Sequence, residues 1–191
     1  MAMTWLVRPG RKSSAANSTR RRPQLEILDE RILLATNPIV AENLLTGTPS
    51  SRWTLSHAGD SSIQGFATDI SINRGSAISF KINDAAKANY HIDIYRLGYY
   101  QGNGARLVTT IPSSQVIPKV QPAPLKNAAT GLVDAGNWTV SASWAVPAGA
   151  TSGLYFAQAK RDDTGGASDI FFVVRDDAGT SDLLFQTADT T

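Results

Sequence analysis

Strict alternation of apolar and polar residues in two neighbouring segments most constrains the fold of this chain. Every second residue is apolar between residues 77 and 82, and the pattern returns between residues 90 and 95. The apolar positions are Ile78, Phe80, Ile82, Tyr90, Ile92 and Ile94. Because successive side chains of a strand point to opposite faces, each segment predicts a strand with one buried and one solvent-facing side.

Further short apolar segments, separated by turn signals, predict strands through the rest of the body. They lie at Trp53–Ser56, Phe66–Ile72, Ala105–Thr110, Asn137–Pro147, Ser152–Asp163 and Ser168–Asp177. In the strand at 137–147 we expect Trp138, Val140, Ala142 and Trp144 on one face. A proline-rich stretch from Pro112 to Asn137 predicts a long crossover between two sheets.

The spacing of these strands favours an all-β fold. We predict an antiparallel β-sandwich of immunoglobulin or fibronectin type III kind over residues 42–177, with no helix beyond the amino-terminal tail. Asn37-Pro38 predicts an extended or turn segment.

The basic character of the chain, with a pI near 9.0, comes from its first residues. Residues 1–35 hold seven of the 18 Lys and Arg residues but only three of the 16 Asp and Glu residues. The slightly acidic body therefore offers no basic stripe for a nucleic-acid backbone, and we expect no nucleic-acid partner. No apolar run is long enough for a transmembrane helix.

Residues 1–36 predict a disordered or short-helical tail. Within it, RRPQLEILDERILLA (residues 21–35) resembles the LEPR-XLL motif of large exported or surface proteins in some environmental bacteria, although Glu30 stands where proline is usual. The matching residues are Leu25, Glu26, Leu28, Arg31, Leu33 and Leu34. The resemblance implies an extracellular or cell-surface location. An ordinary flexible lead-in is the alternative interpretation.

Conventional catalytic and metal-binding patterns are sparse. The chain has no cysteine and only two histidines, His57 and His91. His91 and Asp93 share one strand face, which we interpret as a solvated sheet surface rather than a metal or acid–base site. The acidic pairs 162–163 and 176–177 are typical of turns, with calcium binding as the alternative. We therefore predict no catalytic and no metal-binding residue.

The stretch QGNG (residues 101–104) raises the question of a phosphate-binding loop. The third glycine of a dinucleotide fingerprint would fall at Leu107, and the following residues predict a strand instead of a helix. The glycines therefore predict positive φ angles in a connection between strands. The best local candidates for a ligand rim are Tyr99, Tyr100, Asn103 and Arg106. Core or cross-strand packing of the aromatic residues is the alternative.

Three stretches resemble the N,N-dimethylformamidase large (beta) subunit-like family. They are IYRLGYYQGNGARLV, WAVPAGATSGLYFAQAKRDD and DIFFVVRDDAGTSDLLFQTADTT, within residues 50–191. The resemblance implies the amino-terminal β-sandwich region that precedes the family's catalytic domain. That domain holds a mononuclear iron with tyrosine and carboxylate ligands, so no cofactor is expected in this chain. Residues 178–191 would be a linker and an orphan strand, Leu183–Thr187, leading toward the missing domain.

The function expected from this resemblance is that of a non-catalytic accessory module, from a truncated or split gene product. It would pack on a catalytic domain or partner chain, or present substrate to it. One alternative is a stand-alone module that binds carbohydrate or a cell-surface polymer. Another is an amidase that a partner chain completes.

Overall fold

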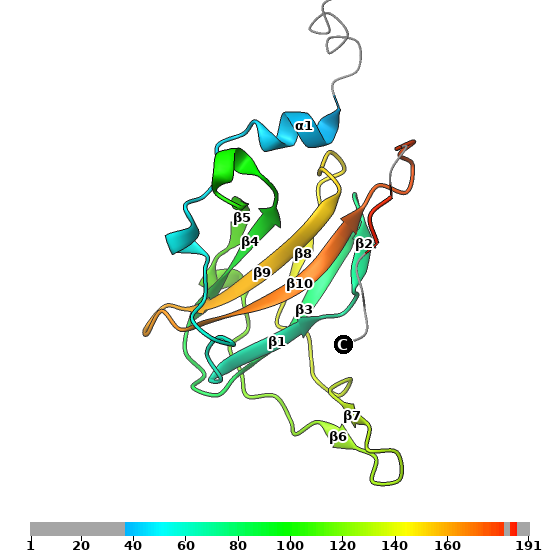
Figure 1. Cartoon of the computed structure of the whole chain (residues 1–191). Coiled ribbons are helices and arrows are strands. Elements are labelled where there is room, and N and C mark those ends of the chain that lie inside the picture. The colour runs from blue at the N-terminus through cyan, green and yellow to red at the C-terminus, as the bar shows by residue number, and fades with distance from the viewer. Residues whose placement is uncertain (1–36, 182–183, 187–191) are drawn as a thin grey trace, which may run out of the picture. The chain divides into compact units, whose positions relative to one another are not determined.

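Two β-sheets face each other in the computed structural model, which describes residues 37–181 and 184–186 (Figure 1). One sheet has three strands in the order β1-β3-β8, and the other has five in the order β2-β10-β9-β4-β5. The strands of these sheets are β1 (Ile63–Ala67), β2 (Ser71–Asn73), β3 (Ala77–Asp84), β4 (Tyr90–Leu97), β5 (Ala105–Ile111), β8 (Ala142–Ala145), β9 (Gly153–Arg161) and β10 (Ala167–Arg175). The prediction of an all-β sandwich is confirmed.

The strand pairings follow the immunoglobulin pattern, with hairpin neighbours in one sheet and crossovers to the other. All pairings within the two sheets are antiparallel except that between β2 and β10, which is parallel. Tyr155, near the start of β9, donates its hydroxyl to the carbonyl of Thr151 at 2.6 Å. A tyrosine that ties the start of a late core strand to the preceding turn is a known mark of such sandwiches.

The core lies between the two sheets, and the alternating strands β3 and β4 both contribute buried residues to it. Ile78, Phe80 and Ile82 of β3 have no exposed surface, and the alternate residues of β4 are equally buried. Phe80 meets Phe172 of β10, with 5.8 Å between ring centroids. The period-two pattern therefore identified the inner faces correctly.

Two early strand predictions are wrong. Trp53–Ser56 is irregular and follows a 3-10 turn, η2 (Ser50–Arg52), because the Trp53 indole turns onto the sheet and donates to the Thr48 carbonyl at 3.0 Å. The predicted strand Phe66–Ile72 is two strands, since β1 ends at Ala67 and β2 begins at Ser71 in the other sheet.

The strand predicted within residues 137–147 is shorter than expected. Only Ala142–Ala145 forms β8, with Ala142 and Trp144 buried. Val140 is exposed, and Trp138 packs on Phe66 of β1 with 5.7 Å between centroids. The four residues therefore do not share one strand face.

A short helix, α1 (Pro38–Asn43), occupies the segment that was expected to be extended or a turn, so the prediction of no helix beyond the tail is wrong. The Asn37 side chain accepts a hydrogen bond from the Ile39 amide at 2.9 Å, and Pro38 stands at the first helical position. An N-cap asparagine followed by proline is a favourable helix start, and this signal was missed. No helix in the described part of the chain has the length and apolarity to cross a bilayer.

The proline-rich stretch is a crossover from β5 to β8, as predicted. It begins with a 3-10 turn, η4 (Ser113–Gln115), and carries a small hairpin of β6 (Leu125–Lys126) and β7 (Val133–Asp134). The hairpin projects away from the two sheets (Figure 1). Of the predicted orphan strand, residues 184–186 have no strand structure and the remainder lies outside the described residues, as does the tail 1–36.

Candidate functional site

A second apolar cluster lies on the outer face of the five-stranded sheet. Tyr95 and Phe156 are buried there and stack with 5.0 Å between ring centroids and 13° between planes. Trp53 covers them from the segment before β1, at 6.0 Å from the Phe156 ring. Because the indole is also held by Thr48, this aromatic wall is fixed before any ligand arrives.

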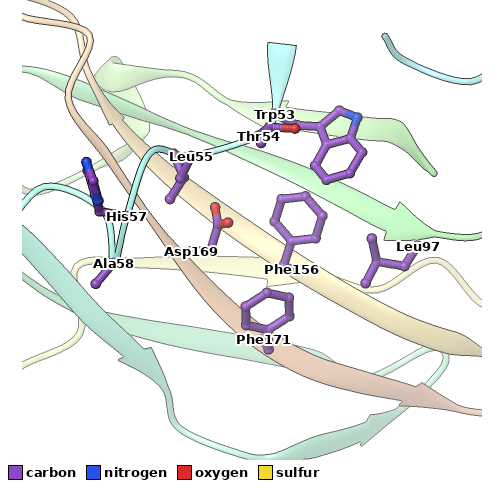
Figure 2. Close-up of a pocket in the computed structure, with 9 residues that line it drawn as sticks. All are labelled: Trp53, Thr54, Leu55, His57, Ala58, Leu97, Phe156, Asp169 and Phe171. Carbon is purple, nitrogen blue, oxygen red and sulfur yellow. The ribbon is translucent and has the colours of Figure 1, made fainter. Parts of the chain in front are cut away.

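An open pocket of about 430 Å³ adjoins this cluster (Figure 2). It lies between the segment Trp53–Ala58 and the strands β9 and β10. Figure 2 shows the Phe156 ring between those of Trp53 and Phe171, and Phe171 is 57% exposed. The lining residues are Trp53, Thr54, Leu55, His57, Ala58, Leu97, Phe156, Asp169 and Phe171.

A single carboxylate stands among these apolar walls. The side-chain amide of Gln158 donates to Asp169 Oδ1 at 3.0 Å and to the Trp53 carbonyl at 2.8 Å. Burial raises the pKa of Asp169, and the hydrogen bond from Gln158 offsets this only in part. The pocket therefore combines aromatic rings with one acidic group whose charge is poorly solvated.

The predicted ligand rim surrounds the glycine turn between β4 and β5. Gly102 and Gly104 have φ angles of +92° and +80°, as predicted. Tyr100 and Gln101, in the 3-10 turn η3 (Tyr100–Gly102), also have positive φ, at 39° and 57°. Residues with a Cβ are strained in this region, so neighbouring contacts have to hold the turn.

The structure uses three of the four rim residues internally. Tyr100 is fully buried, the Asn103 side chain donates to the Tyr100 carbonyl at 3.0 Å, and Arg106 pairs with Glu42. Tyr99 is 71% exposed. A ligand role for the rim stays a prediction, and Tyr99 is its accessible member.

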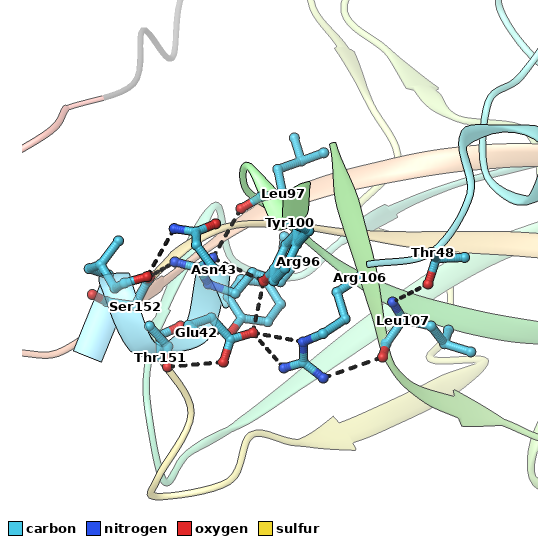
Figure 3. Close-up of polar contacts among 12 residues, drawn as sticks. Glu42, Asn43, Thr48, Arg96, Leu97, Tyr100, Arg106, Leu107, Thr151 and Ser152 are labelled. Carbon is cyan, nitrogen blue, oxygen red and sulfur yellow. Dashed lines mark hydrogen bonds and ion pairs between the residues drawn. The ribbon is translucent and has the colours of Figure 1, made fainter. Parts of the chain in front are cut away.

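Glu42 of α1 joins these internal residues into one network (Figure 3). Its Oε1 accepts hydrogen bonds from the Tyr100 hydroxyl and from Arg106 Nε, each at 2.8 Å. Arg96 donates to the Tyr100 oxygen at 3.0 Å and to the Ser152 carbonyl at 2.8 Å. The network thus ties α1, the glycine turn and the loop before β9 together.

The charges of the network are mutually stabilised. Burial by itself raises the pKa of Glu42, but the hydrogen bonds from Tyr100 and Arg106 outweigh it and the pKa is lowered. Burial raises the pKa of Tyr100, and the neighbouring Glu42 carboxylate adds to this. Glu42 is therefore ionised and Tyr100 neutral near pH 7, which suits a structural brace more than proton transfer.

The crossover arm, residues 117–140, exposes many apolar side chains. They are Ile117 (56%), Val120 (48%), Leu125 (56%), Leu132 (62%), Val133 (60%) and Val140 (41%). The base of the arm is anchored, because the Gln121 amide donates to the carbonyls of Ile82 at 3.1 Å and Thr139 at 2.8 Å. The tip is a short hairpin with two strand pairings, and the Asn127 amide donates to the Leu132 carbonyl at 2.9 Å beyond them.

His91 and Asp93 share the outer face of β4, as predicted. His91 Nδ1 lies 2.6 Å from Asp162 Oδ1, and its Nε2 lies 3.8 Å from Asp93 Oδ2. The other members of the acidic pairs lie beside arginines: Asp163 beside Arg161, Asp176 beside Arg74 and Asp177 beside Arg175. Within residues 37–181 and 184–186, no group of three His, Asp or Glu residues is placed to hold a metal ion.

Sequence reasoning missed Glu42, Arg96 and the pocket. The sole signal for Glu42 is that no other acidic residue occurs between residues 31 and 59. The pocket joins residues from 53 to 171, and it forms only when β9 and β10 pair beneath the Trp53 segment.

Three solved structures that match part of the chain share little sequence with it. The cellulose-active LPMO CelS2 in complex with copper is 17% identical, covering 57% of this chain and 53% of its own, with a TM-score of 0.34. The AA10 lytic polysaccharide monooxygenase from Streptomyces lividans is 19% identical, covering 55% and 56%, with a TM-score of 0.33. The alkylpurine DNA glycosylase AlkC from Pseudomonas fluorescens, bound to DNA containing an abasic site analog, is 12% identical, covering 61% and 31%, with a TM-score of 0.32.

The chain spans about half the length of the two monooxygenases. A search of curated proteins found no match.

The family described as N,N-dimethylformamidase beta subunit-like, C-terminal, matches residues 91–191. The match begins in β4 and takes in the glycine turn, the crossover arm and the strands β8 to β10. The family resemblance is confirmed, but the matching region is described as C-terminal, not as the amino-terminal region named in the sequence analysis. Since the match covers more than half of its residues, this chain belongs to the N,N-dimethylformamidase beta subunit-like family.

Proposed function

We propose that this chain is a non-catalytic accessory module that packs against a catalytic domain or partner chain through its crossover arm. The observation that carries the proposal is the set of six exposed apolar side chains on residues 117–140. Soluble proteins rarely expose apolar side chains in such groups unless the surface meets a partner.

The construction of the arm supports this role. Trp138 holds the base to the sandwich by packing on Phe66 of β1, and its indole closes the base of the arm with a hydrogen bond to the Pro122 carbonyl at 2.9 Å. The hairpin at the tip is too short to be stable alone, because isolated two-stranded ribbons are marginal in water. An anchored base with an apolar tip suits docking into a complementary surface, whose contacts would stabilise the hairpin.

Family membership supports the identity of the partner. The chain would pack on the domain that supplies amide hydrolysis, including its iron, and the LEPR-XLL resemblance of residues 21–35 would place it outside the cytoplasm. The partner to test is a separately expressed catalytic domain of the same family.

The test is binding between the two purified chains, measured by sedimentation velocity. We expect a one-to-one complex that Leu132→Asp weakens at least about tenfold, because a charge would be buried in an apolar contact. The matched control is Ile70→Asp, since Ile70 is 63% exposed against 62% for Leu132 and lies in the loop between β1 and β2. Equal loss of binding in both variants, or no loss in either, would show that the arm is not the docking surface.

A second candidate function, binding of a carbohydrate or surface polymer by the chain alone, is favoured by Tyr99. This ring is 71% exposed beside the glycine turn, where it is free to stack on a sugar. The test is retention on polysaccharide columns of the wild type and Tyr99→Ala. Tyr100→Ala is not a clean probe, because it removes a buried ring that bonds Glu42. Retention that Tyr99→Ala leaves unchanged would exclude this site.

A further inference from the structure

The pocket on the outer face of the five-stranded sheet has no part in the proposed docking. Its floor is formed by the aromatic side chains of β9 and β10, and its wall is the segment that contains Trp53 (Figure 2). Its volume of about 430 Å³ lies within the range of small-molecule sites, roughly 300–1,000 Å³. The residues of its lining determine which ligand chemistry it would recognise.

Side-chain contacts hold the walls of the pocket in place. Phe156 is 1% exposed and is held by the stacked Tyr95 ring, while Trp53 is held by its indole hydrogen bond to Thr48. Phe171 lies 5.6 Å from Phe156 between centroids and stays open to solvent. The rings therefore offer a preformed apolar surface with one accessible aromatic side chain.

Asp169 sets the charge preference of this surface. One of its oxygens accepts the Gln158 amide, and among the described residues the other oxygen has no hydrogen-bond partner and no Lys or Arg pairs with the carboxylate. Burial raises its pKa, so the ionised form costs the fold stability near pH 7. A partly buried carboxylate without a charged partner favours binding of a cation.

Aromatic rings add to the same preference. A cation over the face of a tryptophan or phenylalanine is attracted by the negative face of the ring, and organic ammonium groups are bound in this way. Anions would be repelled by Asp169, and a neutral sugar would need more hydrogen-bonding groups than this mostly apolar lining provides. His57, at the rim, is the sole lining residue that can carry a positive charge.

We propose that this pocket binds a small organic amine in its protonated form, with Asp169 as counter-ion and Trp53 and Phe171 around its apolar body. Gln158 is a positioning residue, because its amide bonds both the carboxylate and the backbone of Trp53. The site is independent of the arm, so either proposal can fail without the other.

The experiment is a titration of the isotope-labelled full chain with benzylammonium chloride, followed by NMR shifts of residues 54–58 and 169–171. We expect saturable binding with a Kd in about the millimolar range for a ligand of this size. Benzyl alcohol, which has nearly the same shape without the charge, should bind at least about tenfold more weakly. Sodium chloride at equal concentration controls for ionic strength.

Two variants assign the binding to named residues. Asp169→Asn keeps the shape and can still accept from Gln158, and it should weaken benzylammonium at least about tenfold. Phe171→Ala should weaken it severalfold and keeps the test valid if the first variant is poorly folded. Asp134→Asn, a change of the same type on β7, should leave binding unchanged.

The proposal is overturned if benzyl alcohol binds as tightly as benzylammonium, or if no saturable shifts occur at these residues. It is also overturned if Asp169→Asn binds as well as the wild type. Binding that depends on both the charge of the ligand and Asp169 supports the assignment.

Discussion

Glu42 joins distant segments of the chain through one carboxylate. Its oxygens accept hydrogen bonds from Tyr100, Arg106 and Thr151, which stand in the glycine turn, in β5 and before β9. At the residue scale, this buried brace explains how a turn with two strained non-glycine residues keeps its conformation.

Glu42→Gln should lower the free energy of unfolding by about 1–3 kcal/mol, because it leaves the buried Tyr100 hydroxyl and the half-buried Arg106 without a charged acceptor. Urea denaturation measures the change. The control is Asp163→Asn, which also breaks a two-bonded arginine pair, but with half of the Asp163 side chain exposed. We expect a clearly smaller loss there, since exposed pairs add little. Equal losses would mean that burial of the Glu42 brace does not matter.

The lowered pKa of Glu42 also predicts a pH dependence. A carboxyl with a depressed folded pKa contributes stability above its unfolded pKa of about 4.3, and this contribution is lost as the pH falls through the folded pKa. The stability difference between wild type and Glu42→Gln should therefore be constant from pH 6 to 8 and shrink below about pH 4.5. A difference that persists unchanged to about pH 2 would contradict the ionic role.

At the scale of single elements, the crossover arm and β9 differ most in how fully their strands are paired. β9 is paired along its length with β4 on one side and β10 on the other, whereas β6 and β7 pair only with each other. The prolines and low periodicity of residues 112–137 predicted a crossover, but nothing in them predicted the hairpin.

Hydrogen exchange should reveal this contrast. Amides of Asn127–Val133 should show protection factors at least about a hundredfold below those of β9, because the hairpin opens locally while β9 opens only with the whole sandwich. Mass spectrometry of exchanged peptides gives the measurement. Addition of the docking partner should raise protection in the arm alone, and slow exchange there without a partner would show that the arm is already packed.

At the scale of the whole molecule, stability depends on the contact between the two sheets. Phe172 points inward, is 1% exposed and meets Phe80, Trp144 and Tyr155. Its neighbour Phe171 points outward from the same strand. The two positions therefore separate the role of the core from that of the pocket.

Phe172→Ala should lower the free energy of unfolding by about 3–5 kcal/mol, through lost burial and the cavity left between the sheets. Phe171→Ala, the same change on the outer face, should cost less than about 1 kcal/mol. Thermal and urea unfolding of both variants measure the difference. Similar losses would mean that the outer aromatic cluster carries as much stability as the core.

The sequence by itself determined the inner faces of β3 and β4, the strand character of β9 and β10, and the positive φ angles of the glycine turn. These follow from local rules: period-two burial, β-branched and aromatic composition, and the freedom of glycine. It also carried the family resemblance, which the match over residues 91–191 confirmed.

Only the tertiary structure decided how the rim residues are used and where the pocket lies. Tyr100 and Arg106 are adjacent to a glycine turn in the sequence. Their hydrogen bonds depend on Glu42, which lies in a helix 58 residues before Tyr100. Trp53, Asp169 and Phe171 form one pocket because segments far apart in the chain meet on the outer face of the sheet. Such contacts depend on which chain segments pair and cover one another, and the local sequence pattern does not encode this pairing.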